Sequence, residues 1–332
     1  MQYRDLGHSG IRASVVGLGT WVTGGGEMWH GADDAESLRA IDAALDCGVN
    51  LIDTAPAYGW GHSERIVGQA IRGRRDKVVL ATKCGIWWAD NRGSFHYHFD
   101  GKDTFISLHP ETVAIEIENS LRNLDTDYID LYQTHWPSKE PDFTPIEDTM
   151  AFLMKLKDQG KIRAIGVCNV SVEQLEEYCA NGDIASDQFR YSMLYRAPEA
   201  DVLPYCAKHG IATLTYMSLE QGLLTGKVGM DRVFDPNEFR SNEAWNTWFK
   251  LVNRRKVLAM LEGWKDLTEK YDCTPAQLVI AWTAAQSGVT HVLCGARTAE
   301  QAKQNAAAGA LTLEAADVAR MRNDAVALGD PE

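Results

Sequence analysis

The stretch LIDTAPAYGWGHSERIVGQAI, residues 51–71, contains the repeating unit that decides the fold. Its apolar start predicts a buried strand that ends at Asp53, and a glycine-flanked loop leads from there into an amphipathic helix. The same order recurs along almost the whole chain. The predicted strands are residues 15–19, 50–55, 77–83, 128–135, 163–169, 185–191, 211–217 and 290–295. Eight parallel strands, each followed by a helix, predict an α/β fold of the (β/α)8 TIM-barrel type.

Further features complete the predicted architecture. Residues 2–14 predict an N-terminal β-hairpin, with its turn at residues 8–10, that closes the bottom of the barrel. Two unusually long βα loops are predicted, at residues 84–109 and 218–255. Barrels of this type bind substrate and cofactor in such loops. Because no linker or change of composition divides the chain, we expect a single domain over residues 1–332. The predicted helices are residues 35–48, 63–73, 110–124, 145–160, 171–182, 198–210 and a longer stretch near 256–287.

Composition argues against several classes of protein. The net charge of −13 argues against nucleic acid or an anionic membrane as the main partner. The seven cysteines include no C-x-x-C pair, which indicates reduced thiols rather than disulfides or a zinc site. His96 and His98 lack a third clear ligand, so no metal site is expected. Because no apolar leader or spanning segment is present, we expect a soluble, cytoplasmic protein.

Four titratable residues lie at or just beyond the ends of predicted strands. Asp53, Lys83 and His135 close three of these strands, and Tyr58 lies in the loop that follows Asp53. The ammonium of Lys83, oriented by Asp53, is expected to stabilise tyrosinate and lower the pKa of Tyr58. Such a phenol can protonate a carbonyl oxygen as hydride reaches the carbon, while His135 orients the carbonyl or shares the proton transfer. Each residue alone has an ordinary structural interpretation, but their joint placement favours a catalytic site.

The residues around these positions resemble those of the aldo-keto reductase superfamily. DTAPAYGWGHSE, residues 53–64, is similar to the family signature D-T-A-x-x-Y-G-x-G-x-S-E. Other motifs follow in the family's order over essentially the whole chain, namely GLGTW (17–21), TK (82–83), YIDLYQTHWP (128–137), GKIRAIGVCN (160–169) and QGLLTGK (221–227). The chain most resembles the branch with a long seventh loop, which includes potassium-channel β-subunits and bacterial sugar- or inositol-linked reductases. This resemblance implies a TIM-barrel enzyme of residues 1–332 with the catalytic tetrad Asp53, Tyr58, Lys83 and His135.

The resemblance also implies how a nicotinamide cofactor binds, since no G-x-G-x-x-G supports a Rossmann site. Asn169 and Gln188 would bond the carboxamide, and Tyr216 would stack on the ring. The cofactor-binding residues implied are Thr20, Trp21, Asp53, Cys168, Asn169, Gln188, Tyr216, Met217, Ser218, Leu219, Gln221, Gly222, Leu224, Gly226, Lys227, Arg240, Gly295, Arg297, Gln301 and Asn305. Cys168 replaces the family's usual serine, so one contact differs. Arg297 is available for a 2′-phosphate, which favours NADPH while leaving NADH possible.

The substrate pocket is expected to be aromatic. Its candidate residues are Trp21, Tyr58, Trp60, Trp87, Trp88, His135 and Trp136. Flat aromatic side chains with polar groups at their edges suit a small carbohydrate-like carbonyl compound. We therefore expect an NADPH-dependent reductase of an aldehyde or ketone. Two alternatives stay open: an NAD(P)-dependent aldose or polyol dehydrogenase working in the oxidative direction, and a cofactor-binding redox sensor with slow turnover. The oligomeric state is also open, and residues 98–110 form either a lid or an edge that binds a partner.

Overall fold

Parallel strands form a closed barrel in the computed structural model, which describes residues 1–26, 29–236 and 238–332. Within these residues the barrel runs in the order β3-β4-β5-β9-β10-β11-β12-β13 and then returns to β3. The strands are β3 (Val16–Gly19), β4 (Leu51–Asp53), β5 (Val79–Cys84), β9 (Ile129–Thr134), β10 (Ile162–Cys168), β11 (Ile184–Arg190), β12 (Ala212–Tyr216) and β13 (His291–Gly295). Each predicted strand corresponds to one barrel strand, so the predicted TIM barrel is confirmed.

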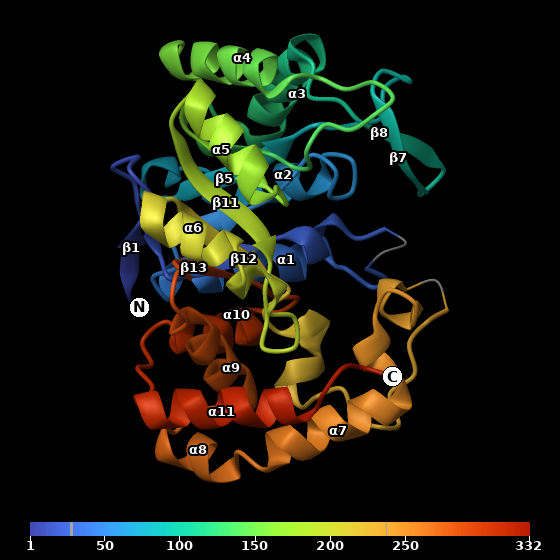
Figure 1. Cartoon of the computed structure of the whole chain (residues 1–332). Helices are drawn as coiled ribbons and strands as arrows, with labels where there is room; N and C mark the ends of the chain where they lie inside the picture. Colours follow the sequence, from blue (N-terminus) through green and yellow to red (C-terminus); the bar gives the residue numbers. More distant parts are fainter. Residues whose placement is uncertain (27–28, 237) are drawn as a thin grey trace.

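Helices surround this barrel, as Figure 1 shows. They are α1 (Asp34–Asp46), α2 (His62–Ile71), α3 (Pro110–Leu124), α4 (Ile146–Asp158), α5 (Val172–Asn181), α6 (Val202–His209), α7 (Leu251–Glu262), α8 (Lys265–Lys270), α9 (Pro275–Ala284), α10 (Ala299–Ala308) and α11 (Ala315–Ala327). The long helical stretch expected near residues 256–287 is divided into α7, α8 and α9. Pro275 has no N–H to continue a helix, and Thr274 and Gln277 form a capping box that starts α9.

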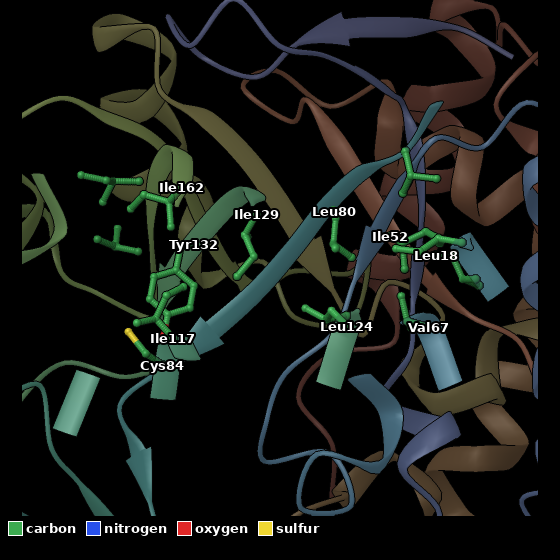
Figure 2. Packing of buried hydrophobic residues seen from close by; sticks show 14 of the residues in the cluster. Leu18, Ile52, Val67, Leu80, Cys84, Ile117, Leu124, Ile129, Tyr132 and Ile162 are labelled. Carbon is green, nitrogen blue, oxygen red and sulfur yellow. The ribbon is translucent and has the colours of Figure 1, made fainter. Parts of the chain in front are cut away.

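The hydrophobic core has an outer layer and an inner one. The outer layer lies between the strands and the helices, and Figure 2 shows Ile52 and Leu80 of the barrel beside Val67 of α2 and Leu124 of α3. The inner layer fills the amino end of the barrel, where Leu6 packs against strand residues. Leu6 directly follows β1 (Tyr3–Asp5), which pairs antiparallel with β2 (Arg12–Ser14). The predicted N-terminal hairpin that closes the barrel is therefore confirmed.

The two long connections contain structure of their own. The first carries β6 (Ile86–Trp87), β7 (Ser94–Phe99) and β8 (Lys102–Ile106), which form an antiparallel sheet in the order β6-β8-β7. We call residues 86–106 the arm; β7 and β8 project to one side of the barrel in Figure 1. The second connection carries the short 3-10 helices η4 (Glu220–Thr225), η5 (Phe239–Ser241) and η6 (Thr247–Phe249). No helix in the part of the chain that the structure describes is long and apolar enough to cross a membrane.

Asp187 on β11 is a buried acid outside the predicted site. Its side chain is fully buried, and neither carboxyl oxygen has a hydrogen-bond partner among the described residues. Burial raises the pKa of Asp187 well above its ordinary value of 3.8, and the nearby backbone N–H of Gln188 acts in the opposite direction. The protonated carboxyl therefore favours the folded state at low pH, and this contribution is lost as the pH rises through the folded-state pKa.

We therefore expect Asp187→Asn to change how stability depends on pH. Above a pH of 3.8 the free energy of unfolding of the wild type should fall relative to that of the variant. The expected slope is at most about 1.4 kcal/mol per pH unit, and it ends once the folded-state carboxyl has ionised. Urea unfolding of both proteins between about pH 4 and pH 8 measures this difference. Parallel stability curves would show that Asp187 does not titrate differently in the folded and unfolded chains.

Candidate active site

The carboxyl ends of three neighbouring strands bring the four predicted titratable residues to one mouth of the barrel. Asp53 ends β4, Lys83 lies near the end of β5 and His135 follows β9. These strands are adjacent and parallel, so their ends lie together. Tyr58 reaches the same place from the loop after β4. That loop packs closely against the backbone of Gly24. A Cβ on Gly59 would lie 2.2 Å from the carbonyl oxygen of Gly24, so only glycine fits at this position.

Lys83 joins the residues of this mouth. Its Nζ donates to Asp53 Oδ1 at 2.6 Å, to the Thr54 carbonyl at 2.9 Å and to Tyr58 Oη at 3.2 Å. These three acceptors match the three protons of an ammonium group. Lys83 is fully buried and Asp53 is 3% exposed, so the ion pair is shielded from water. The phenol of Tyr58 is therefore held beside a fixed positive charge.

Two glutamines hold the other carboxylate oxygen of Asp53. Gln133 Nε2 donates to Asp53 Oδ2 at 3.1 Å, and Gln188 Nε2 donates to the same atom at 2.8 Å. Cys168 Sγ lies 3.9 Å from Gln133 Oε1, so this thiol faces the barrel interior. Sequence reasoning missed Gln133, although it is a polar residue two positions before His135 in a strand with apolar neighbours. Its amide helps to hold the buried carboxylate in one orientation.

The pKa values in this mouth are set mainly by burial and by the Asp53–Lys83 pair. Burial raises the pKa of Tyr58 to about 12, although the ammonium of Lys83 acts in the opposite direction. The expected net lowering of the Tyr58 pKa is therefore wrong, because desolvation of the phenolate outweighs the nearby cation. Burial acts to lower the pKa of Lys83, but Asp53, Tyr58 and Cys168 together outweigh it and the pKa is raised. The structure thus holds a protonated phenol beside a charged lysine.

His135 lies beside the phenol as a neutral imidazole. Its ring centroid is 5.9 Å from that of Tyr58, and the two rings are nearly perpendicular. Burial, the charge of Lys83 and then that of His96 lower the pKa of His135 well below its ordinary value. At neutral pH one ring nitrogen carries a proton and the other does not. Tyr58 and His135 can therefore each donate one hydrogen bond to an oxygen placed between them.

Glu116 of α3, which sequence reasoning also missed, supports this arrangement from behind. The backbone N–H of Gly85 donates to Glu116 Oε2 at 2.9 Å, and the N–H of His135 donates to the carbonyl of Cys84 at 2.8 Å. The Cys84–Gly85 segment that follows Lys83 is thus held from both sides. Glu116 is 4% exposed, and its Oε1 has no partner within the described ranges of the chain. Only the fold shows that this acid faces a strand end.

We expect Glu116→Ala to lower kcat about tenfold, because the strand end that carries Lys83 loses its anchor. Glu116→Gln keeps a carbonyl acceptor for Gly85 and should recover most of the activity. Steady-state kinetics and thermal unfolding of both variants measure these effects. Glu118→Ala is the matched control, since Glu118 lies on the same helix, is exposed and pairs with Lys161 at the surface. A Gln variant as impaired as the Ala variant would show that the hydrogen bond to Gly85 is not what matters.

The residues implied for the nicotinamide end lie around the tetrad. Tyr216 Oη donates to Asn169 Oδ1 at 2.8 Å, and Asn169 Nδ2 donates to the His135 carbonyl at 3.1 Å. The amide of Asn169 is therefore held in one orientation at the mouth. Thr20 Oγ1 donates to the Asp53 carbonyl at 2.9 Å and is buried, so its side chain joins two loops. Trp21 has its ring 6.5 Å from that of Tyr58.

The part of the implied cofactor set expected to bind the pyrophosphate lies on η4 and on the residues directly before and after it. Gln221 and Gly222 both have positive φ, and Gln221 Nε2 donates to Asn246 Oδ1 at 2.8 Å. Ser218 and Leu224 are buried, so Leu224 belongs to the core and only its backbone can serve a ligand. Lys227 Nζ lies 3.3 Å from Gln304 Oε1 and is exposed. The remaining residues of this set are Met217 and Gly226, which have positive φ, and Leu219, which packs against the core.

The residues implied for the adenosine end are connected by hydrogen bonds. Asn305 Nδ2 donates to the Gly295 carbonyl at 3.0 Å, and the N–H of Arg297 donates to Gln301 Oε1 at 2.8 Å. These contacts fix the turn between β13 and α10. Together with Arg240 of η5, Arg297 lies against the indole of Trp29, with guanidinium carbons 5.5 and 5.3 Å from its ring centroid.

This arginine pair creates local positive charge in an acidic protein. Burial and the neighbouring charge of Arg240 lower the pKa of Arg297. Its Nη2 is buried and has no hydrogen-bond partner among the residues that the structure describes. Arg240 is paired with Glu238. An unused, buried guanidinium N–H beside a second cation fits a phosphate group, which accepts several charge-assisted hydrogen bonds.

The aromatic residues implied for the substrate pocket separate into two groups. Trp60 lies 5.2 Å from Trp88 between ring centroids, and its Nε1 donates to Asp100 Oδ2 at 3.0 Å. Trp136 directly follows His135 at the mouth. Trp87 is different, because it is 4% exposed and its Nε1 donates to Asp90 at 2.7 Å. The structure therefore places Trp87 in the base of the arm as a packing residue.

Comparison with known proteins identifies this arrangement. The model of the Aldo/keto reductase family matches residues 15–324. The chain belongs to the aldo/keto reductase family. This aldo/keto reductase is an NAD(P)H-dependent oxidoreductase that reduces carbonyl compounds. In the described part of the chain, no group of three or more His, Cys, Asp or Glu residues is placed to hold a metal ion.

Proteins similar to this aldo/keto reductase carry names of different activities. It is 44% identical over 332 residues to the NADH-specific methylglyoxal reductase of Escherichia coli (strain K12), with 99% of each chain covered. It is 31% identical over 322 residues to a probable voltage-gated potassium channel subunit beta of Arabidopsis thaliana, covering 92% of this chain and 90% of that one. The structure is similar to that of the glycerol dehydrogenase AKR11B4 from Gluconobacter oxydans, with a TM-score of 0.86, 37% identity and coverage of 99% and 96%.

Proposed function

We propose that this enzyme uses NADPH to reduce a small oxygenated aldehyde or ketone to the alcohol, as a single aldo/keto reductase domain of residues 1–332. The observation that carries the proposal is the hydrogen-bonded series Asp53–Lys83–Tyr58, with the neutral ring of His135 beside the phenol. This series supplies a proton donor and a fixed positive charge at one point of the barrel mouth. Reduction of a carbonyl needs a proton on its oxygen, and the positive charge stabilises the phenolate that proton donation leaves.

In the proposed mechanism each residue has one role. The substrate oxygen lies between the Tyr58 hydroxyl and the imidazole of His135, and both donate hydrogen bonds to it. Tyr58 gives its proton to this oxygen, and the O–H bond of the alcohol forms as the phenolic O–H bond breaks. The ammonium of Lys83, held by Asp53, stabilises the phenolate until a proton from water restores it. The bound nicotinamide cofactor supplies the hydride that adds to the carbonyl carbon.

The residues present fit such a cofactor. Asn169, which Tyr216 orients, would hold the carboxamide with Gln188, and Tyr216 would lie against the ring. The backbone around Gln221 and Gly222 would hold the pyrophosphate, since its positive φ values allow backbone N–H groups to approach phosphate. The remaining residues of the implied set are proposed as contacts of the same cofactor: Thr20, Trp21, Asp53, Cys168, Met217, Ser218, Leu219, Leu224, Gly226, Lys227, Arg240, Gly295, Arg297, Gln301 and Asn305.

We expect Arg297→Ala to raise the KM for NADPH by about tenfold or more and to change that for NADH by less than about twofold. The free Nη2 of Arg297 is proposed to bond the 2′-phosphate, a group that NADH lacks, and a charge-assisted hydrogen bond of this kind is worth about 1.5–3 kcal/mol. Arg72→Ala is a matched control, because Arg72 is exposed and pairs with Asp125 on another face.

Because one relative is an NADH-specific methylglyoxal reductase, this experiment can distinguish NADPH from NADH as the preferred cofactor. If the wild type uses NADH better than NADPH, and Arg297→Ala affects both cofactors equally, Arg297 does not bind a 2′-phosphate. The enzyme would then be assigned to NADH.

The proposed substrates are short carbonyl compounds that carry a further oxygen, including α-oxoaldehydes and carbohydrate-like carbonyl compounds. The names of the two enzymes support this class, since methylglyoxal and glycerol are both three-carbon molecules with more than one oxygen. Trp60 and Trp88, whose rings lie in contact, would supply apolar faces for such a substrate. Loss of reduced-cofactor absorbance with methylglyoxal, glyceraldehyde, propanal and benzaldehyde tests the proposal. Preference for propanal or benzaldehyde would contradict the substrate class.

Two other functions have support from the comparisons. The similarity to a glycerol dehydrogenase favours polyol oxidation, which NADP+ reduction with glycerol would reveal. The relative that is a channel β-subunit favours a slow redox sensor. A sensor would bind the cofactor but complete less than about one turnover per minute with every carbonyl compound, far below the rates typical of enzymes.

A further inference from the structure

His96 occupies an irregular position in the arm. In the β7–β8 ladder Phe95 pairs with Phe105 and Tyr97 pairs with Thr104. Between these two pairs β7 advances by two residues while β8 advances by one. His96 is the extra residue of this bulge. A β-bulge turns a side chain away from the regular alternation of the strand, and bulges are frequent beside active sites.

The bulged strand is fastened to the loop that follows His135. Ser94 Oγ donates to the Lys139 carbonyl at 2.6 Å, and the N–H of Gly93 donates to Asp142 Oδ2 at 2.7 Å. The ring of His96 lies 5.6 Å from that of Trp136, the residue directly after His135. The arm therefore carries His96 to the wall of the catalytic mouth.

The imidazole of His96 is unused by the protein. It is partly exposed, and its ring nitrogens make no hydrogen bond to any residue within 1–26, 29–236 and 238–332. Burial and the charge of Lys139 lower the pKa of His96 to about 4, so the ring is neutral at neutral pH. His96 and His135 are close enough for the charge of one to act on the other. A neutral ring offers one donor and one acceptor nitrogen beside the tetrad.

We propose that His96 determines substrate specificity by hydrogen-bonding a second oxygen of the substrate, on the carbon next to the carbonyl that Tyr58 and His135 hold. This inference rests on the proposed function and deepens it. It selects carbonyl compounds with an adjacent oxygen, namely α-oxoaldehydes and α-hydroxyaldehydes, over simple aldehydes of the same length. The indole of Trp136, which directly follows His135 and lies beside the ring of His96, would cover the carbon chain that joins the two oxygens.

The test compares methylglyoxal with propanal, which has the same three carbons but one oxygen. We expect His96→Leu to lower kcat/KM for methylglyoxal about tenfold, mainly through KM, because a ground-state hydrogen bond is lost. The value for propanal should change less than about twofold. His96→Gln keeps a donor and an acceptor and should recover most of the methylglyoxal activity.

His98→Leu is the matched control, since His98 lies on the same strand, is exposed and bonds Asp103. It should change neither substrate. Equal losses with both substrates in His96→Leu, or no loss with either, would overturn the proposed contact. A wild-type enzyme that reduces neither compound would instead refute the proposed function, and the inference with it.

Discussion

Tyr58→Phe is expected to lower kcat for carbonyl reduction by at least about a hundredfold. The variant removes one oxygen, the only hydroxyl within the described residues that Lys83 Nζ contacts, at 3.2 Å. Without this donor, charge that builds on the substrate oxygen must be neutralised by water or by the neutral ring of His135, and both are poorer acids here. The affinity for NADPH, measured by fluorescence titration, should change less than about twofold, because the ring itself remains.

The pH dependence provides an independent check on the same residue. With its pKa raised to about 12, Tyr58 stays protonated through the neutral range, and its ability to donate is lost only as the pH rises towards that value. Between about pH 6 and pH 9, the wild type should therefore lose no larger fraction of its kcat than Tyr58→Phe does. Tyr205→Phe, in α6 and outside the site, is the control for removal of a phenol oxygen. Full turnover in Tyr58→Phe would show that another group supplies the proton.

Lys83→Met is expected to abolish detectable turnover and to destabilise the protein by about 3–5 kcal/mol. The variant leaves the carboxylate of Asp53 buried with two amide donors and no cation. It also removes the charge that stabilises the phenolate of Tyr58. Chemical denaturation measures the first effect, and single-turnover kinetics measure the second.

The double variant Asp53→Asn/Lys83→Met separates these two effects. It removes the unpaired charge, so we expect it to recover most of the lost stability, while activity stays absent because no cation lies beside Tyr58. The double variant should therefore regain stability relative to Lys83→Met without regaining activity. If Lys83→Met alone were as stable as the wild type, the ion pair would contribute nothing to the fold.

The placement of the tetrad could be predicted from sequence because parallel strands end at the same edge. Asp53, Lys83 and His135 lie at predicted strand ends, and Tyr58 lies in the loop directly after Asp53. The roles of Gln133, Glu116 and His96 could not be predicted in this way. Their partners come from other strands, from a helix and from a bulge, and none of these contacts leaves a local pattern.

The order of strands, the hairpin and the long connections followed from the sequence by itself, since hydrophobic periodicity and chain length reflect local backbone preferences. Tertiary structure decided the direction of the Tyr58 pKa shift, because desolvation depends on how deeply the finished barrel buries the phenol. It also decided which of the neighbouring tryptophans, Trp87 and Trp88, packs inside the arm. Burial and side-chain orientation are sums over residues distant in sequence, and only the folded chain brings those residues together.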